Sequence, residues 1–273
     1  MITVDTHIHT HFSHGKASVQ EMFDAALAKG MKVFGFSEHS PRPDGFDYPT
    51  DYKQKLTAAW PDYLRQVSAL KENPQGVQVL LGIEMDWTVG QEDYIRQKLA
   101  ADPFDYVIAG IHFLDTWGFD FAPQDWAYWS DDEKFARYEA FFETMTHMAQ
   151  TGLFDIVAHP DIIKIFSVDA FTRWMQTASA KDAVRSALCA VQKAGMAMEV
   201  SSAGLRKLCA EIYPCPFFME TARDLHLPIS FGSDAHSTAS VGYAFTVLET
   251  YARTYGYSQS VFFEKRTMQV RAF

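Results

Sequence analysis

Short apolar runs recur along the chain, and each is followed by a longer stretch in which the apolar residues have helical spacing. The run from Val77 to Ile83 is almost unbroken by polar residues, which is typical of a strand buried on both faces. Runs of this kind predict seven strands, at residues 2–5, 33–36, 77–83, 106–111, 156–158, 197–200 and 228–232. The alternation predicts a parallel sheet covered by helices.

The stretches between these runs predict helices. They lie at residues 18–29, 51–71, 91–101, 131–150, 181–194, 217–225 and 240–253, and a short tail follows the last of them. So many strand–helix units favour a closed barrel over an open doubly wound sheet. Because no repeat, low-complexity segment or linker divides the chain, we expect residues 1–273 to form a single α/β domain, a TIM-like (β/α)7 barrel.

Two segments do not fit a simple connection. Residues 40–49 are polar and contain three prolines, and we interpret them as a lid. The aromatic side chains of residues 113–130 include Trp117, Phe119, Phe121, Trp126, Tyr128 and Trp129. This second segment is either a wall of a pocket or aromatic packing over the barrel mouth, and the sequence favours neither.

Composition narrows the class of protein. The chain of 273 residues is 48% hydrophobic and 21% charged, as expected of a globular protein. No apolar run reaches the length of a membrane span, and the first residues lack the pattern of a signal peptide, so we expect a cytoplasmic protein without a membrane partner. The three cysteines have no CxxC partner, which argues against a disulfide framework or a thiolate zinc site.

The net charge of −10 opposes binding to the backbone of a nucleic acid. An anionic substrate would therefore need a concentrated local positive charge. Metal ions could supply it, and the ten histidines of the chain are candidate ligands.

Histidines and acids lie at or just past the carboxyl ends of the predicted strands, and in a parallel barrel these ends meet at one mouth. His7 and His9 are two residues apart after the first strand, so their side chains would project from the same side and could chelate one ion. Either residue alone is more simply explained as a hydrogen-bonded polar side chain, but the shared position of the whole set favours a metal site. The set comprises His7, His9, His39, Glu84, His112, His159, Asp234 and His236.

Imidazoles and carboxylates without thiolates suit Zn²⁺, Mn²⁺ or Fe²⁺. These ligands are too many for one tetrahedral ion, so we expect a cluster of two or three ions, with Glu84 able to bridge two of them. Hydrolysis at phosphorus is the chemistry that such a cluster serves best.

Taken together, these motifs closely resemble the polymerase and histidinol phosphatase (PHP) family. The resemblance rests on Asp5-Thr6-His7-Ile8-His9-Thr10, Glu38-His39, Gly82-Ile83-Glu84, Gly110-Ile111-His112, Ala158-His159-Pro160 and Ser233-Asp234-Ala235-His236. It implies a distorted seven-stranded barrel of the PHP type with three divalent metal ions.

The resemblance also implies a ligand set for each ion. One ion would take His7, His9, Glu84 and Asp234, the second Glu84, His112 and His159, and the third His14, His39 and His236. His11 is a rival to His14 for the third ion, and spacing alone does not decide between them. Glu84, Asp234 and His236 would also act in catalysis.

Within the family, the chain is most similar to the monofunctional histidinol-phosphate phosphatases, on the stretches 37–41 and 201–207. This likeness implies hydrolysis of L-histidinol phosphate to L-histidinol and phosphate in histidine biosynthesis, through attack of a metal-bound hydroxide. Ser201 departs from the pattern, because an asparagine is expected there. The alternatives are a PHP phosphoesterase for a nucleotide or sugar phosphate, and a noncatalytic metal-binding module.

Three residues are candidates for contacts with the small phosphorylated substrate. Arg206 would grip the phosphate with its fork of donors, unless it is an ordinary surface arginine. Asp161 could meet a cationic group of the substrate, or it could simply start a helix. Arg42 in the predicted lid is a second phosphate candidate.

Overall fold

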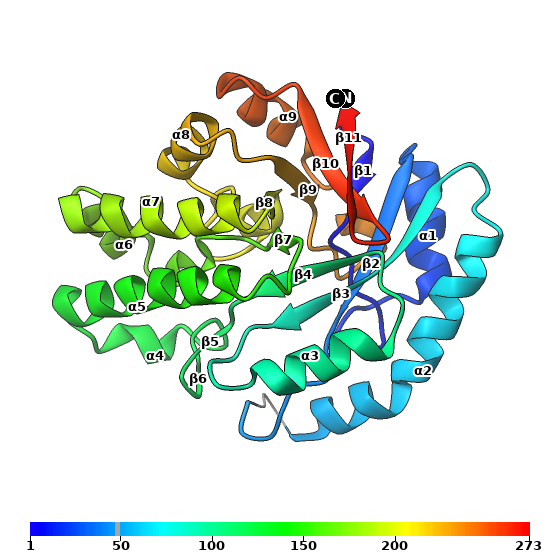
Figure 1. Cartoon of the computed structure of the whole chain (residues 1–273), viewed down its shortest axis with the longest axis horizontal. Coiled ribbons are helices and arrows are strands. Elements are labelled where there is room, and N and C mark those ends of the chain that lie inside the picture. Colours follow the sequence, from blue (N-terminus) through cyan, green and yellow to red (C-terminus); the bar gives the residue numbers. More distant parts are fainter. Residues whose placement is uncertain (47–49) are drawn as a thin grey trace.

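The computed structural model describes residues 1–46 and 50–273. Seven parallel strands form one sheet in the order β1-β2-β3-β4-β7-β8-β9, which confirms the predicted strands and their direction (Figure 1). Their bounds are β1 Val4–Asp5, β2 Val33–His39, β3 Gln78–Asp86, β4 Tyr106–Gly110, β7 Ile156–Val157, β8 Ala197–Ser201 and β9 Ile229–Gly232.

The two edge strands, β1 and β9, approach each other and nearly close the sheet into a barrel. The amide of Thr6 donates to the carbonyl of Phe231 at 3.3 Å. Just beyond the strands, the amide of His9 donates to the carbonyl of Ala235 at 2.9 Å, and the amide of Ala235 donates to the carbonyl of His7 at 3.1 Å. This seam brings the first and last histidine-containing motifs together.

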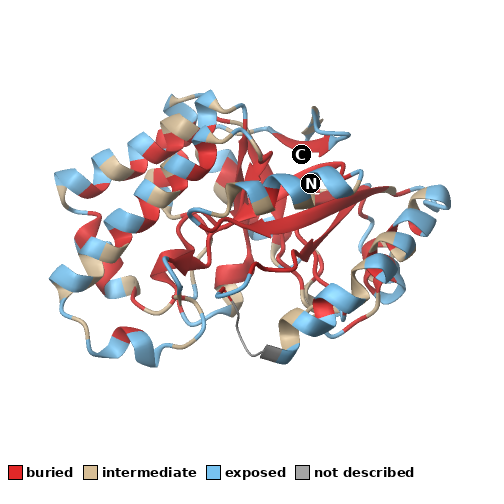
Figure 2. Cartoon of the chain, turned by 60° about the horizontal axis from the view of Figure 1, so that its bottom comes forward, coloured by how far each residue is buried: buried red, intermediate tan, exposed pale blue. Residues whose placement is uncertain are grey.

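Helices cover the outside of the sheet, with their exposed faces outward and the sheet buried between them (Figure 2). Ser18 and Ser130 each form a capping box with the glutamate three residues later, which fixes the starts of the first and fifth helices. The larger helices are α1 Val19–Ala28, α2 Thr50–Glu72, α3 Glu92–Ala101, α5 Asp131–Gln150, α6 Val168–Trp174, α7 Ala178–Lys193, α8 Pro216–Asp224 and α9 Phe245–Thr254.

Two elements differ from the predicted ones near the end of the chain. The last helix begins at Phe245 rather than near residue 240, because residues 238–240 form a short 3-10 turn. The predicted tail is a β-hairpin, with antiparallel strands β10 Gln259–Glu264 and β11 Thr267–Ala272 (Figure 1, red). Val261, Phe262 and Phe263 are buried in a cluster with the first residues of the barrel strands, so the hairpin closes the amino-terminal end of the barrel.

The aromatic segment 113–130 folds into a small hairpin, β5 Phe113–Leu114 with β6 Trp117–Gly118, followed by α4 Gln124–Ala127. The rings of Trp117, Trp126 and Trp129 contact one another, with centroids 4.7 to 5.4 Å apart, and the guanidinium of Arg137 lies 3.4 Å from the ring centroid of Trp129. The segment is thus held by aromatic packing.

The predicted lid is described only as far as Phe46, and residues 47–49 lie outside the described part. Residues 40–43 are buried, so this end of the loop is packed against the barrel. Among the helices that the structure describes, none is long and apolar enough to span a membrane.

Candidate metal centre

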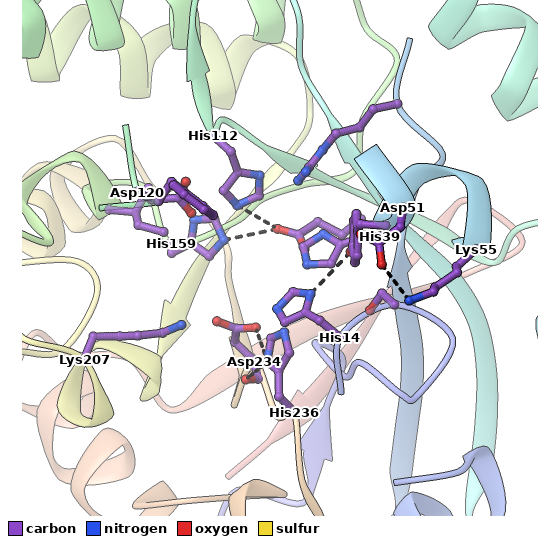
Figure 3. Close-up of a pocket in the computed structure, with 16 residues that line it drawn as sticks. His14, His39, Asp51, Lys55, His112, Asp120, His159, Lys207, Asp234 and His236 are labelled. Atoms are coloured by element: carbon purple, nitrogen blue, oxygen red, sulfur yellow. Dashed lines mark hydrogen bonds and ion pairs between the residues drawn. The ribbon is translucent and has the colours of Figure 1, made fainter. Parts of the chain in front are cut away.

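A cavity of about 470 Å³ opens at the carboxyl ends of the barrel strands. His7 and His9 are fully buried beneath it, while most of the other predicted ligands form its walls (Figure 3). The described residues that line it are Ser13, His14, His39, Arg42, Asp51, Tyr52, Lys55, Glu84, His112, Asp120, Phe121, His159, Ile162, Lys207, Asp234 and His236.

Glu84, on β3, lies at the centre of the histidines. Its Oε2 is 3.3 Å from Nε2 of both His7 and His9, and 3.0 Å from Nδ1 of His39. Its Oε1 faces the other way, 3.2 Å from Nε2 of His159 and 3.6 Å from Nε2 of His112. One carboxylate therefore reaches two separate groups of imidazoles.

Several atoms at this point are buried without a hydrogen-bond partner. Within the described residues they include Nε2 of His7, His9 and His236, Nδ1 of His39, and Oε2 of Glu84. Buried polar atoms are normally paired, so a convergent set of unpaired ring nitrogens around a carboxylate is the arrangement that a cation would complete. Nitrogen and oxygen donors without thiolate fit Zn²⁺, Mn²⁺ or Fe²⁺.

Within the described part of the chain, the spacing of the donor atoms defines three groups that could each hold an ion. In each group the atoms lie within 4.8 Å of one another; the groups are His9, His39 and His236; His7, Glu84 and His159; and His7, His9 and Asp234. His14 lies beside the first group, with its ring centroid 4.2 Å from that of His236 and 5.0 Å from that of His39. His11 contacts Phe12 and is not among the described cavity residues, whereas His14 lines the cavity, so the structure places His14 rather than His11 at the centre.

Three buried acids contact the Nδ1 atoms of three of these histidines. Glu199 Oε1 lies 2.7 Å from Nδ1 of His7, Glu38 Oε1 lies 3.4 Å from Nδ1 of His9, and Asp86 Oδ1 lies 2.5 Å from Nδ1 of His112. Such contacts set the orientation of an imidazole and leave its other nitrogen directed at a metal. No role was predicted for these acids, although Glu38, Asp86 and Glu199 are buried acids in the strands β2, β3 and β8.

The charges in the centre hold its acids ionised. Burial favours the neutral form of Glu84, but the charges of His39, His7 and His112 outweigh burial and hold the pKa of this carboxyl well below its usual range. Burial also favours neutral Asp234, and His236 and His9 lower the pKa of that carboxyl in the same way. The centre therefore keeps two buried carboxylates ready to bind cations.

The pKa values of the imidazoles shift in opposite directions, depending on the neighbouring groups. Burial disfavours protonated His9, yet the nearby carboxylates of Asp234, Glu38 and Glu84 raise its pKa to about 10. For His14, burial and the neighbouring His39 lower the pKa to about 3. Protons on His9 would have to leave before cations bind there, so metal binding to this centre releases protons.

The loop that carries Asp234 is held in an unusual conformation. Asp234 has a φ of 49° and His159 a φ of 26°, values that are uncommon for residues other than glycine and that cluster at functional sites. Asp5 fixes the loop by accepting hydrogen bonds from the amide and hydroxyl of Ser233, at 2.9 and 2.7 Å. At Gly232 a Cβ would lie 2.0 Å from Glu199 Oε1, so only glycine lets the strand approach this closely.

Of the three residues predicted to contact the substrate, one lines the cavity and two do not. Arg42 lines the cavity and is ion-paired with Asp86, with Nε 2.6 Å from Oδ2. Asp161 is not among the described cavity residues, because its carboxylate is buried against Lys164 at 2.8 Å and accepts a hydrogen bond from the amide of Cys215.

Arg206 also lies outside the described cavity wall. Its guanidinium donates to the carbonyls of Ser233 and Asp234 and so braces the loop that carries a predicted ligand. The next residue, Lys207, lines the cavity instead and points toward Asp234 (Figure 3).

Comparison with known proteins identifies the family. Residues 5–203 match the PHP domain, and residues 219–255 match the PHP-associated region. The first match covers more than half of the chain. The chain therefore belongs to the PHP domain family.

Individual relatives are more specific. A probable histidinol-phosphatase of Deinococcus radiodurans is 32% identical over 270 residues, which are 97% of this chain and 98% of the relative. A histidinol-phosphatase of Bacillus subtilis is 29% identical, over 88% of this chain and 96% of its own. Among solved structures, the histidinol phosphate phosphatase of Lactococcus lactis, complexed with zinc, L-histidinol and phosphate, has the same fold, with a TM-score of 0.73, 19% identity and 98% coverage of each chain.

Proposed function

We propose that this protein is a metal-dependent phosphomonoesterase that hydrolyses L-histidinol phosphate to L-histidinol and phosphate, a step of histidine biosynthesis. The observation that carries this proposal is the buried Glu84 carboxylate, which faces two groups of histidines whose ring nitrogens converge on it. The relatives of nearly equal length that are named histidinol-phosphatases support the choice of substrate.

We further propose that the centre holds three divalent ions. His7, His9 and Asp234 would hold one, His112 and His159 a second, and His14, His39 and His236 the third, with Glu84 shared between the first two. The donor groups support His7, His9 and Asp234 as one set and His39 with His236 as another. A third group joins Glu84 and His159 to His7, and His9 is close enough to His39 and His236 to serve the third ion as well. When bound, such ions supply Lewis acidity toward phosphoryl oxygens and lower the pKa of water.

The protein side chains would bind and orient the substrate around these ions. Lys207 brings an ammonium to the cavity wall on the opposite side from Lys55 (Figure 3), where it can bind a phosphate oxygen. Glu84, Asp234 and His236 are proposed to act at the reacting atoms, because all three line the cavity and His236 Nδ1 lies 3.4 Å from Asp234 Oδ1.

We propose that residues 1–273 act as one domain. Strand β9, which lies in the PHP-associated region, pairs with β8 of the PHP domain. The loop after β9 carries Asp234 and His236 to the centre. Separation of the two regions would therefore remove ligands from the proposed site.

Phosphate release tests the substrate. Protein loaded with Zn²⁺, Mn²⁺ or Fe²⁺ is expected to release phosphate from L-histidinol phosphate faster than from a nucleoside monophosphate or a sugar phosphate, and a chelator should abolish the activity. If the protein prefers one of the other esters, the proposal that L-histidinol phosphate is its substrate is wrong. A protein that holds metal but hydrolyses none of them is a noncatalytic module.

The Glu84→Gln variant tests the bridging carboxylate. It should lose bound metal and activity together, because an amide is a poor replacement for a carboxylate shared by two cations. Glu139→Gln, at an exposed position on α5, is the matched control and should retain both. Full metal content and full turnover in Glu84→Gln contradict the proposed role.

A further inference from the structure

Asp120 belongs to the aromatic segment 113–130, and the preceding residue, Phe119, fixes its position beside the candidate metal centre. Phe119 is fully buried against Phe141, with ring centroids 5.6 Å apart. The amide of Phe119 donates to the carbonyl of His112 at 3.2 Å, and its carbonyl accepts from the indole of Trp126 at 2.8 Å. These contacts fix the backbone on which Asp120 is carried.

The side chain of Asp120 lines the cavity beside His112 and His159 (Figure 3). The following residue, Phe121, is 61% exposed and lines the same cavity. Thus the segment presents a carboxylate near the centre and an apolar ring next to it. This combination is suited to a ligand that carries both a cationic group and a flat apolar group.

Asp120 and Asp51 are both described acids of the cavity wall that are not proposed metal ligands, and they lie on different sides of the cavity. Asp51 forms an ion pair with Lys55, with Oδ2 2.8 Å from Nζ, on the side of the cavity away from His159 (Figure 3). Asp120 lies on the side of His112 and His159, the proposed ligands of the second ion (Figure 3).

A carboxylate in this position is unfavourable for a substrate that is only anionic. A phosphate bound at the centre would lie near Asp120, and like charges at close range repel. A substrate that also carries an ammonium group converts this repulsion into attraction. The same residue can therefore favour one class of phosphate ester and reject another.

We infer that Asp120 binds the ammonium group of the substrate and makes the enzyme selective for amino-substituted phosphomonoesters. The inference rests on the proposed phosphatase function and extends it from the reacting phosphate to the other end of the substrate. Because Asp120 acts on the leaving group, its removal affects discrimination between substrates more than metal binding.

A matched pair of substrates tests the inference. L-histidinol phosphate is compared with the corresponding imidazolylpropyl phosphate, which lacks only the amino group. The wild-type protein should have a kcat/KM at least 10-fold higher for the amino ester. In Asp120→Asn this preference should fall to about 3-fold or less, mainly through kcat/KM of the amino ester, because Asn keeps the shape and removes the charge.

Two further measurements separate recognition from a structural role. Inhibition by the product L-histidinol should weaken about 10-fold in Asp120→Asn, while bound metal per chain stays at the wild-type value. Asp115→Asn, at an exposed position in the same segment, is the control and should keep the wild-type preference and inhibition.

The outcomes distinguish this inference from the proposed function. If the wild-type protein hydrolyses L-histidinol phosphate but Asp120→Asn keeps the full preference for the amino ester, the inference is wrong and the proposed function stands. An equal loss for both esters in Asp120→Asn, or a wild-type enzyme without preference, also overturns the inference. If the wild-type protein hydrolyses neither ester, the proposed function fails and the inference fails with it.

Discussion

Replacement of Glu199 by Gln should weaken metal binding at the candidate centre by about 10- to 100-fold while leaving the fold intact. Glu199 is buried on β8, and its two carboxylate oxygens have separate partners. Oε1 lies 2.7 Å from Nδ1 of His7, and Oε2 accepts from the amide of His159 at 2.7 Å. One acid thus orients two proposed metal ligands that lie far apart in the sequence.

The magnitude follows from what a glutamine can replace. Its amide oxygen can accept from either partner but not from both, and its NH₂ group is a donor facing a second donor. The variant therefore loses about one hydrogen bond to a charged group, worth about 1.5–3 kcal/mol. That free energy corresponds to about 10- to 100-fold in affinity for the ion held by His7.

The assay is competition for Zn²⁺ with a chromophoric chelator, together with phosphatase activity at limiting and saturating metal. We expect Glu199→Gln to lose activity at limiting metal and to regain most of it at saturating metal, because the residue orients ligands and does not touch the substrate. Glu139→Gln serves again as the control. Wild-type metal affinity in Glu199→Gln would refute the positioning role of Glu199.

Two other predictions follow from the cavity wall and the hairpin. Lys207→Ala should raise KM for the phosphate ester about 10-fold with metal content unchanged, whereas Arg206→Ala should reduce metal content by loosening the Asp234 loop. Measurement of KM and of bound metal per chain checks both variants. Loss of metal in Lys207→Ala, or a raised KM with full metal content in Arg206→Ala, would contradict these roles. Phe263→Ala should lower the free energy of unfolding by about 3–5 kcal/mol, because it opens a cavity under the barrel. Val270→Ala, which is 60% exposed, should change that free energy by less than about 0.5 kcal/mol in denaturant titrations, and equal effects of the two variants would contradict the closing role of the hairpin.

Local patterns determined most of the barrel. The helix predicted at residues 131–150 has those bounds in the structure, because Ser130 and Glu133 form a capping box that acts within one turn. The seven strands could be predicted because parallel strands buried on both faces are continuous apolar runs. Parallel topology then places the ends of all these strands at one mouth, so the candidate metal ligands could be recognised before their distances were known.

The hairpin at the end of the chain could not be predicted in the same way. Its turn residues, Lys265 and Arg266, both have positive φ, with values of 50° and 61°. Glycine or asparagine normally marks such a turn, and neither is present here. The turn is held by contacts with distant residues, since the amide of Arg266 donates to the carbonyl of Asp105 and its guanidinium binds Asp155.

The sequence by itself determined the strands, most of the helices and the set of histidines and acids at the barrel mouth, because each depends on local periodicity or on the ends of strands. The tertiary structure alone decided between neighbours: His14 rather than His11 lies at the centre, and Lys207 rather than Arg206 lines the cavity. It also paired Glu199 with His7 across the barrel. Which of two adjacent side chains meets a partner depends on the closure of the β1–β9 seam and on the loops packed around it, and these contacts join residues far apart in the sequence.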